Sequence, residues 1–298
     1  MNKTKRAMTF VILAASMWGT VGVSVKVLSG FGLTAIQMVV ARLVVAAVLI
    51  GIFLLITDKS KLKISKKDIK YFIGTGICSM LFFNTCYCVT VQLTSLSIAA
   101  VLLYTSPIFV TIFSVPIFKE KLTVKKVMAM IGSVLGCALV SGVLSTGMAG
   151  VSLKGLIFGI FAAIGYGFYG IQARMLVKKY HSYTILFYTF LIAGLGGICI
   201  GDVGGILHIV KNEPVSLGII VITAIICNVM PYIFYTTALK YIEASKASVT
   251  ASVEPVVATV LGVILYKESI TVSGILGILC VLLAIGVLNQ DKCIEERQ

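Results

Sequence analysis

Long apolar runs alternate with short polar or basic connections along almost the whole of the 298-residue chain. A helix needs about 20 mainly apolar residues to cross the hydrocarbon core of a bilayer. Ten runs approach or exceed that length, so the pattern predicts an all-α membrane protein with ten transmembrane helices. The runs are residues 8–28, 33–57, 70–91, 96–117, 125–145, 152–175, 183–206, 215–239, 245–266 and 271–289.

The first run follows the basic residues Lys3, Lys5 and Arg6, as the apolar core of a secretory signal peptide would. It extends from Met8 to about Leu28, which is longer than that core usually is, and further spans come after it. We therefore expect a first transmembrane helix that is retained.

The basic residues test this count, because cytoplasmic loops of membrane proteins carry an excess of lysine and arginine. With the N-terminus placed inside, 20 of the 25 basic residues fall in cytoplasmic segments. A missed or extra span would destroy that asymmetry, so we predict that both termini lie inside. The basic residues on the outer side are then Lys26, Lys154, Lys211 and Lys267, and Arg42 is left within a span.

Composition agrees with a membrane protein, since 59% of the residues are hydrophobic and 12% are charged, against about 25% charged in soluble domains. The net charge of +14 does not indicate a nucleic-acid partner, because the basic residues lie between apolar segments. We expect a multi-pass protein of the cell membrane, of the bacterial cytoplasmic type, with the lipid bilayer as its surroundings.

The eight cysteines do not suggest a disulfide framework or a metal site. Seven lie in apolar runs, where a thiol behaves as a small hydrophobic group. Cys86 and Cys88 are two residues apart and point in different directions on a helix, which makes a poor pair of metal ligands. We therefore predict no metal and no cofactor.

The two halves of the chain resemble each other at a constant offset of 148 residues. Residues 97–124 align without a gap on residues 245–272, with ten of 28 positions identical, including Pro107 with Pro255. The prediction is two five-helix repeats, 1–148 and 149–298. Because five is odd, the second repeat enters the membrane from the opposite side, and transporters of that design bind substrate near the midplane between the halves.

These residues resemble a known family. Each half ends in small residues, a proline and then "KE" before its last helix, most fully in residues 238–288. "ASMWGTVGVSVK" (15–26) and Arg42 also match the pattern. The chain resembles the EamA-like branch of the drug/metabolite transporter superfamily over essentially its whole length. The resemblance implies a ten-helix secondary transporter with a central cavity, for substrates ranging from amino acids and sugars to organic cations.

Glu254 is the one acidic residue deep in a span, in "TASVEPVVATV" (250–260). Burial disfavours its charged form, and such a group usually faces a cavity or a partner. Pro255 removes the hydrogen bond to the carbonyl of Ala251, and Ser106 beside Pro107 is the counterpart of Glu254 in the first repeat. We expect two broken helices to meet around a polar centre, where Glu254 binds a cationic group or a proton. The structural alternative is an ion pair with Arg42.

Further polar and aromatic residues at membrane depth are candidates for lining the cavity, with helix packing as the alternative for each. A buried amide must find partners, which favours the two asparagines. The candidates are Trp18, Asn84, Tyr87, Tyr104, Tyr166, Asn228, Tyr232 and Tyr235.

GxxxG spacings, such as Gly132 with Gly136, predict close helix packing within the monomer, with a homodimer face as the alternative. Glu120 and Glu268 are expected to neutralise nearby lysines or to cap the next helix, outside the substrate site.

The sequence thus predicts a secondary transporter for a small polar substrate such as an amino acid or organic cation. Coupling to a proton or another ion gradient and plain facilitated exchange are both open, and the family resemblance favours export. There is no P-loop pattern for ATP drive. A passive facilitator or channel is the alternative. An intramembrane enzyme is the weakest, because one isolated carboxylate is too little for acid–base chemistry.

Overall fold

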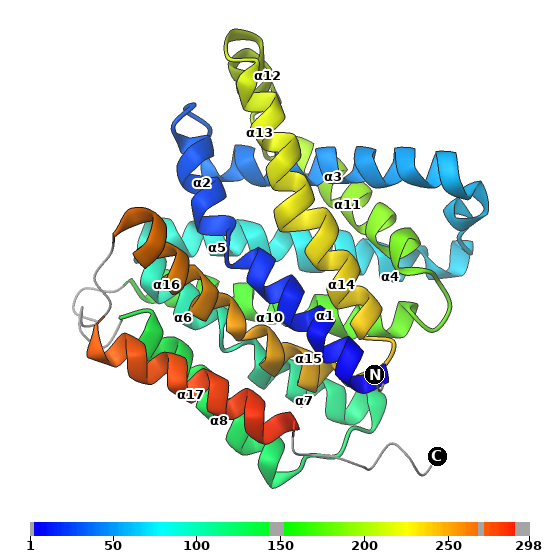
Figure 1. Cartoon of the computed structure of the whole chain (residues 1–298). Coiled ribbons are helices and arrows are strands. Elements are labelled where there is room, and N and C mark those ends of the chain that lie inside the picture. Colours follow the sequence, from blue (N-terminus) through cyan, green and yellow to red (C-terminus); the bar gives the residue numbers. More distant parts are fainter. Residues whose placement is uncertain (1–2, 143–151, 268–270, 290–298) are drawn as a thin grey trace.

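The computed structural model describes residues 3–142, 152–267 and 271–289, and every regular element in these ranges is helical (Figure 1). The first half contains α1 (Lys3–Trp18), α2 (Val21–Ser29), α3 (Ala35–Thr57), η1 (Lys59–Leu62), η2 (Lys66–Asp68), α4 (Ile69–Ile73), η3 (Gly74–Leu81), α5 (Phe82–Leu93), α6 (Leu96–Leu103), α7 (Ser106–Phe118) and α8 (Val124–Val140). The second half contains α10 (Leu153–Leu176), α11 (Ser182–Ile198), α12 (Val203–Asn212), α13 (Val215–Ala224), η4 (Ile225–Val229), α14 (Met230–Ala238), α15 (Ala244–Ala251), α16 (Val253–Tyr266) and α17 (Val272–Asn289).

Seven helical stretches of the described chain are long and apolar enough to cross a membrane. The number becomes eight if α11 and α12, which meet at a bend of 98°, form one span. Two of the predicted runs, 125–145 and 271–289, fall on the shorter helices α8 and α17. The structure therefore supports a multi-pass membrane protein, while the count of ten spans and their orientation stay predictions.

Three of the long spans are broken near their middles. The breaks lie between α1 and α2, between α6 and α7, and at Ser252 between α15 and α16. Pro107 and Pro255 stand in the first turns that follow the second and third breaks, where the missing N–H of proline costs no helical hydrogen bond. The π-helical segments η3 and η4 interrupt two further spans, and such segments often occur at functional sites.

Close helix packing holds the halves together. The most extensive helix–helix contact joins α8 to α17, which run side by side at one edge of the bundle (Figure 1). A Cβ atom on Gly277 would lie 2.6 Å from the Gly136 carbonyl oxygen, so only glycine permits this approach. The first and second halves also meet where α3 packs on α11 and α5 on α10.

Candidate functional site

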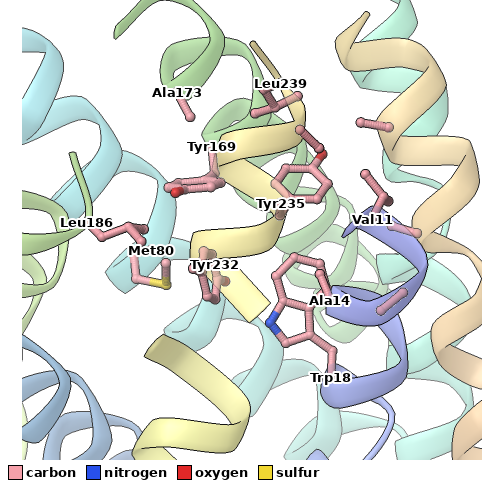
Figure 2. Packing of buried hydrophobic residues seen from close by; sticks show 14 of the residues in the cluster. Val11, Ala14, Trp18, Met80, Tyr169, Ala173, Leu186, Tyr232, Tyr235 and Leu239 are labelled. Carbon is pink, nitrogen blue, oxygen red and sulfur yellow. The ribbon is translucent and has the colours of Figure 1, made fainter. Parts of the chain in front are cut away.

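Aromatic rings fill the middle of the bundle, where α1, α10 and α14 meet (Figure 2). Trp18 packs edge-on against Tyr232 with ring centroids 5.0 Å apart, and it also contacts Tyr166 at 6.1 Å and Tyr235 at 5.4 Å. Aromatic pairs prefer such tilted geometries. Four of the predicted site residues, from three helices, therefore form one cluster.

The cluster encloses a cavity of about 10 Å³, lined by these four residues together with Phe83, Gly167, Tyr169 and Ser248. One water molecule needs roughly 10–15 Å³ measured in this way. The centre of the bundle is therefore closed around a space the size of a single water, and an organic molecule could enter only after the helices move apart.

Glu254 lies at the edge of this aromatic cluster, in the first turn of α16. The break at Ser252 places its half-buried side chain there. The Tyr104 and Tyr166 side chains lie within hydrogen-bonding range of the carboxylate. Gly19, at the break after α1, allows a close approach, because a Cβ atom there would lie 3.0 Å from the Glu254 carbonyl oxygen. Tyr104 itself caps the end of α6, so side chains from two helix breaks meet at this carboxylate.

The neighbourhood of Glu254 contains hydroxyl and thiol groups. Tyr87, Tyr232 and Cys137 lie within electrostatic range of the carboxylate. Within the described ranges, no lysine or arginine forms an ion pair with it. The alternative expectation, an ion pair between Glu254 and Arg42, is therefore not what the structure has.

Arg42 lies in α3, with only 7% of its surface exposed. Cys227 is within hydrogen-bonding range of its guanidinium, and Cys88 and Tyr232 are its other close polar neighbours. The Arg42 Nε atom has no hydrogen-bond partner. Asn228, one residue after Cys227 in η4, is also buried, and its Oδ1 atom is likewise unpartnered.

Two predicted site residues show only local or structural surroundings. The Asn84 Nδ2 atom donates to the Met80 carbonyl oxygen at 2.7 Å, one turn earlier on the same helical stretch. Ser106 is buried at the start of α7, and its carbonyl oxygen lies close to Gly167 of α10. A third predicted residue, Tyr87, packs with Cys86 and with Phe83 and Tyr166 of the cavity wall.

Sequence reasoning missed Tyr169, which belongs to the aromatic cluster. Its ring stacks edge-on against Tyr232 at 5.1 Å, and its hydroxyl shares a hydrogen bond with Thr236 at 2.6 Å. A signal was present, because Tyr169 follows Tyr166 by three residues, as Tyr235 follows Tyr232, and residues three apart share a helix face.

A second buried carboxylate, Glu120, lies at one end of the bundle, just after α7. Its side chain is 3% exposed and forms ion pairs with Arg174 of α10 and with Lys126, whose Nζ atom lies 3.9 Å from Oε2. It also accepts hydrogen bonds from the Ala244 N–H, at 3.2 Å, and from the Ser245 hydroxyl. We call these residues, with Glu243 paired to Lys126 at 2.5 Å, the Glu120 network.

The Glu120 network confirms the first of two alternatives predicted for Glu120. It neutralises a nearby lysine, Lys126, and does not cap the helix that follows it. Thr123 caps α8, because its hydroxyl oxygen accepts from the Lys126 N–H at 3.2 Å. Glu268, the counterpart of Glu120 in the second half, lies outside the described residues.

A larger hollow of about 490 Å³ lies elsewhere, between α3 and α11. Its walls are almost entirely aliphatic and aromatic, from residues such as Val48, Ile52 and Phe187. A specific polar ligand needs a few placed polar groups, so this hollow is a poor substrate site. In the described ranges, no three His, Cys, Asp or Glu side chains gather as they would around a metal ion.

Known proteins resemble this chain along its whole length. The model of the EamA-like transporter family matches it twice, over residues 5–142 and 153–290. An uncharacterized transporter of Clostridium kluyveri is 26% identical over 301 residues, covering 97% of this chain and 94% of the relative. The uncharacterized transporter YxxF of Bacillus subtilis is 28% identical, over 77% of this chain and 73% of the relative.

A crystal structure of similar fold covers 95% of this chain and 96% of its own, with a TM-score of 0.76 and 16% identity. At that identity the likeness concerns the fold alone. The family model, however, covers nearly every residue of the chain in two consecutive matches. The protein therefore belongs to the EamA-like transporter family and is a multi-pass membrane transporter.

Proposed function

We propose that this protein is a secondary transporter that moves a small polar metabolite, such as an amino acid or an organic cation, by alternating access. The observation that carries the proposal is the Glu254 carboxylate, at a helix break beside the aromatic cluster, with tyrosine hydroxyls but no cation of the described residues to neutralise it. A carboxylate at membrane depth is costly unless it has a partner. A cationic group of the substrate, or a proton, supplies that partner.

An inverted repeat supports alternating access. Besides the double family match, Lys119 and Lys267 occupy positions 148 residues apart and share the rare left-handed backbone, each with φ of 55°. The π-helical segment η4 (Ile225–Val229) corresponds at the same offset to the last residues of η3. Two halves of one design, inserted in opposite directions, can exchange conformations to face either side in turn.

The closed centre and the Glu120 network suggest how access is controlled. The network ties α10 and the start of α15 to the connection between α7 and α8 at one end of the bundle. The segments predicted to be cytoplasmic gather at this end, where Tyr180 donates to Asp68 at 2.5 Å and Thr184 to the Lys61 carbonyl at 2.8 Å. Opening toward that side would require the Glu120 network to separate.

Coupling to protons follows from the same carboxylate. A carboxylate that meets tyrosine hydroxyls can bind either a proton or the cationic group of the substrate, and exchange of one for the other would drive export. The family assignment argues against an intramembrane enzyme.

Labelled-substrate exchange in proteoliposomes tests the proposal. Wild type and Glu254→Gln are compared for amino acids and organic cations, with and without a pH gradient. Glu213→Gln, which changes an exposed loop carboxylate, is the matched control. We expect Glu254→Gln to lose at least about 30-fold in transport, the effect of truncating one partner of a buried charge pair, and to lose its response to pH. Wild-type rates and pH response in Glu254→Gln would refute the role of the carboxylate.

The same vesicles separate a carrier from the alternative, a passive facilitator or channel. A carrier with alternating access accelerates uptake of label when unlabelled substrate is loaded inside, and its rate saturates. A channel shows neither effect. Linear, unaccelerated flux would overturn alternating access while leaving open a role of Glu254 in selectivity.

A further inference from the structure

Arg42 is a second charge that has no oppositely charged partner among the described residues. Its side chain is 93% buried within the protein. No carboxylate of the described residues pairs with it. Arginine stays protonated in proteins, and burying a charge without a counter-charge is strongly unfavourable. The site therefore needs an anion that the described chain does not supply.

In the part of the chain that the structure describes, polar side chains but no acid surround this guanidinium. Cys227 lies against it and also contacts the Ser24 hydroxyl, with Sγ and Oγ 3.2 Å apart. Asn228, the next residue, is 92% buried. Its Oδ1 atom, which has no partner among the described residues, can only accept a hydrogen bond, so only its side-chain N–H groups suit an anion. The planar guanidinium presents paired N–H donors that match the two oxygens of a carboxylate.

Tyr232 connects Arg42 to the Glu254 region. It is within electrostatic range of both charges, and its ring is part of the wall of the central cavity. Arg42 and Glu254 therefore both act on one tyrosine of the cavity wall, and among the described residues they are not paired with each other. A ligand that carries one charge of each sign would give each of them a partner.

We propose that Arg42 is the carboxylate-binding residue of the transport site, and that the substrate is a small zwitterion. Its carboxylate meets Arg42 and its ammonium group meets Glu254. The inference rests on the proposed function and narrows it, because an organic cation without an anionic group would leave Arg42 unpaired. The aromatic walls contact the apolar part of the molecule.

Matched sets of compounds test the inference in proteoliposomes. Each set contains a zwitterion, the amine that lacks its carboxylate, and the acid that lacks its amino group. The zwitterions are the common L-amino acids and the series from glycine to 6-aminohexanoate, which varies the separation of the two charges. Competition with exchange gives an apparent affinity for each compound, for wild type, Arg42→Gln, Arg42→Lys and Glu254→Gln.

We expect wild type to bind the preferred zwitterion at least about tenfold more tightly than its amine. In Arg42→Gln the affinities for zwitterion and amine should become equal while exchange of the amine continues. Arg42→Lys should keep part of the preference for the zwitterion. Equal affinity of wild type for zwitterion and amine, or an equal loss for both in Arg42→Gln, would overturn the inference and leave the proposed function standing. Indifference of every compound to Glu254→Gln, or exchange of none by wild type, would instead overturn the proposed function.

Thermal unfolding in detergent shows whether a variant loses transport because it fails to fold. Removing a buried charge that has no protein partner should not lower the unfolding midpoint, so Arg42→Gln should be at least as stable as wild type. A clear loss of stability in Arg42→Gln, restored by Arg42→Lys, would show that the arginine is structural and would overturn the inference.

Discussion

Glu254 and Glu120 are the same residue type in opposite circumstances. Glu120 is surrounded by two cations, a backbone N–H and a serine hydroxyl at one end of the bundle. Glu254 meets two tyrosine hydroxyls beside an aromatic cavity and, within the described ranges, no cation. A carboxylate that is paired with protein cations and hydrogen-bond donors holds segments together. A carboxylate that lacks a cationic partner can bind a substrate cation or a proton. The first should therefore matter for stability and the second for transport.

Glu120→Gln should give the largest effect on stability. Removing one member of a buried ion pair leaves the others uncompensated and costs about 3–5 kcal/mol. We expect the lower end, about 3 kcal/mol, because Lys126 keeps Glu243 as a partner. The loss is measured by thermal or denaturant unfolding in detergent.

Glu254→Gln is the matched control for that measurement, since it makes the same chemical change at the other buried carboxylate. It should be neutral or stabilising, because it removes a carboxylate with no cationic partner while glutamine can still accept from the tyrosines. Equal destabilisation by the two substitutions would break the contrast between the regions.

Tyr166→Phe and Tyr104→Phe test the hydroxyls that face Glu254. A hydrogen bond to a charged group contributes about 1.5–3 kcal/mol, so each substitution should weaken transport by roughly tenfold or more if the ionised form binds substrate. Tyr183→Phe, a half-buried tyrosine stacked on His181 at the start of α11, is the control. Wild-type transport in both test variants would mean that the hydroxyls only fill space.

Lys119→Gly examines the turn that presents Glu120. Lys119 has φ of 55°, a left-handed conformation that costs a residue with a Cβ atom about 1 kcal/mol and glycine nothing. The variant should be more stable by up to about that amount, offset by the greater freedom of its unfolded chain. Lys121→Gly, which changes a neighbouring lysine outside that conformation, should not gain stability. A stability loss in Lys119→Gly would show that the lysine side chain itself supports the turn.

Asp68→Asn should have the smallest effect, because this carboxylate pairs with the exposed side chain of Lys179. Hydrogen bonds from Lys179 and Tyr180 lower the pKa of Asp68 below its usual 3.8. The unfolded chain then binds more protons, so the contribution is present above pH 3.8 and is lost as pH falls through the lower folded-state pKa. The slight difference in midpoint between wild type and variant at neutral pH should vanish in acid; a difference that grew in acid would contradict this sign.

Local patterns allowed much of this architecture to be predicted. As far as the chain is described, each of the ten apolar runs falls on one helix or on consecutive helical segments, and Pro107 and Pro255 mark two of the breaks. Local patterns did not predict the aromatic cluster, because it depends on how α1, α10 and α14 approach each other. Its members are Trp18, Tyr166, Tyr232 and Tyr235. Tyr169 was missed although its spacing from Tyr166 pointed to the same face.

The sequence by itself determined that this is a polytopic helical membrane transporter with one deep carboxylate and one deep arginine, because hydropathy, proline positions and charge are local properties of the chain. Only the tertiary structure decided that Glu254 and Arg42 do not pair, that both neighbour Tyr232, and that Glu120 does find its cations. Whether a buried charge is neutralised depends on atoms from distant helices within about 4 Å, where electrostatic energies in a medium of low polarity are largest.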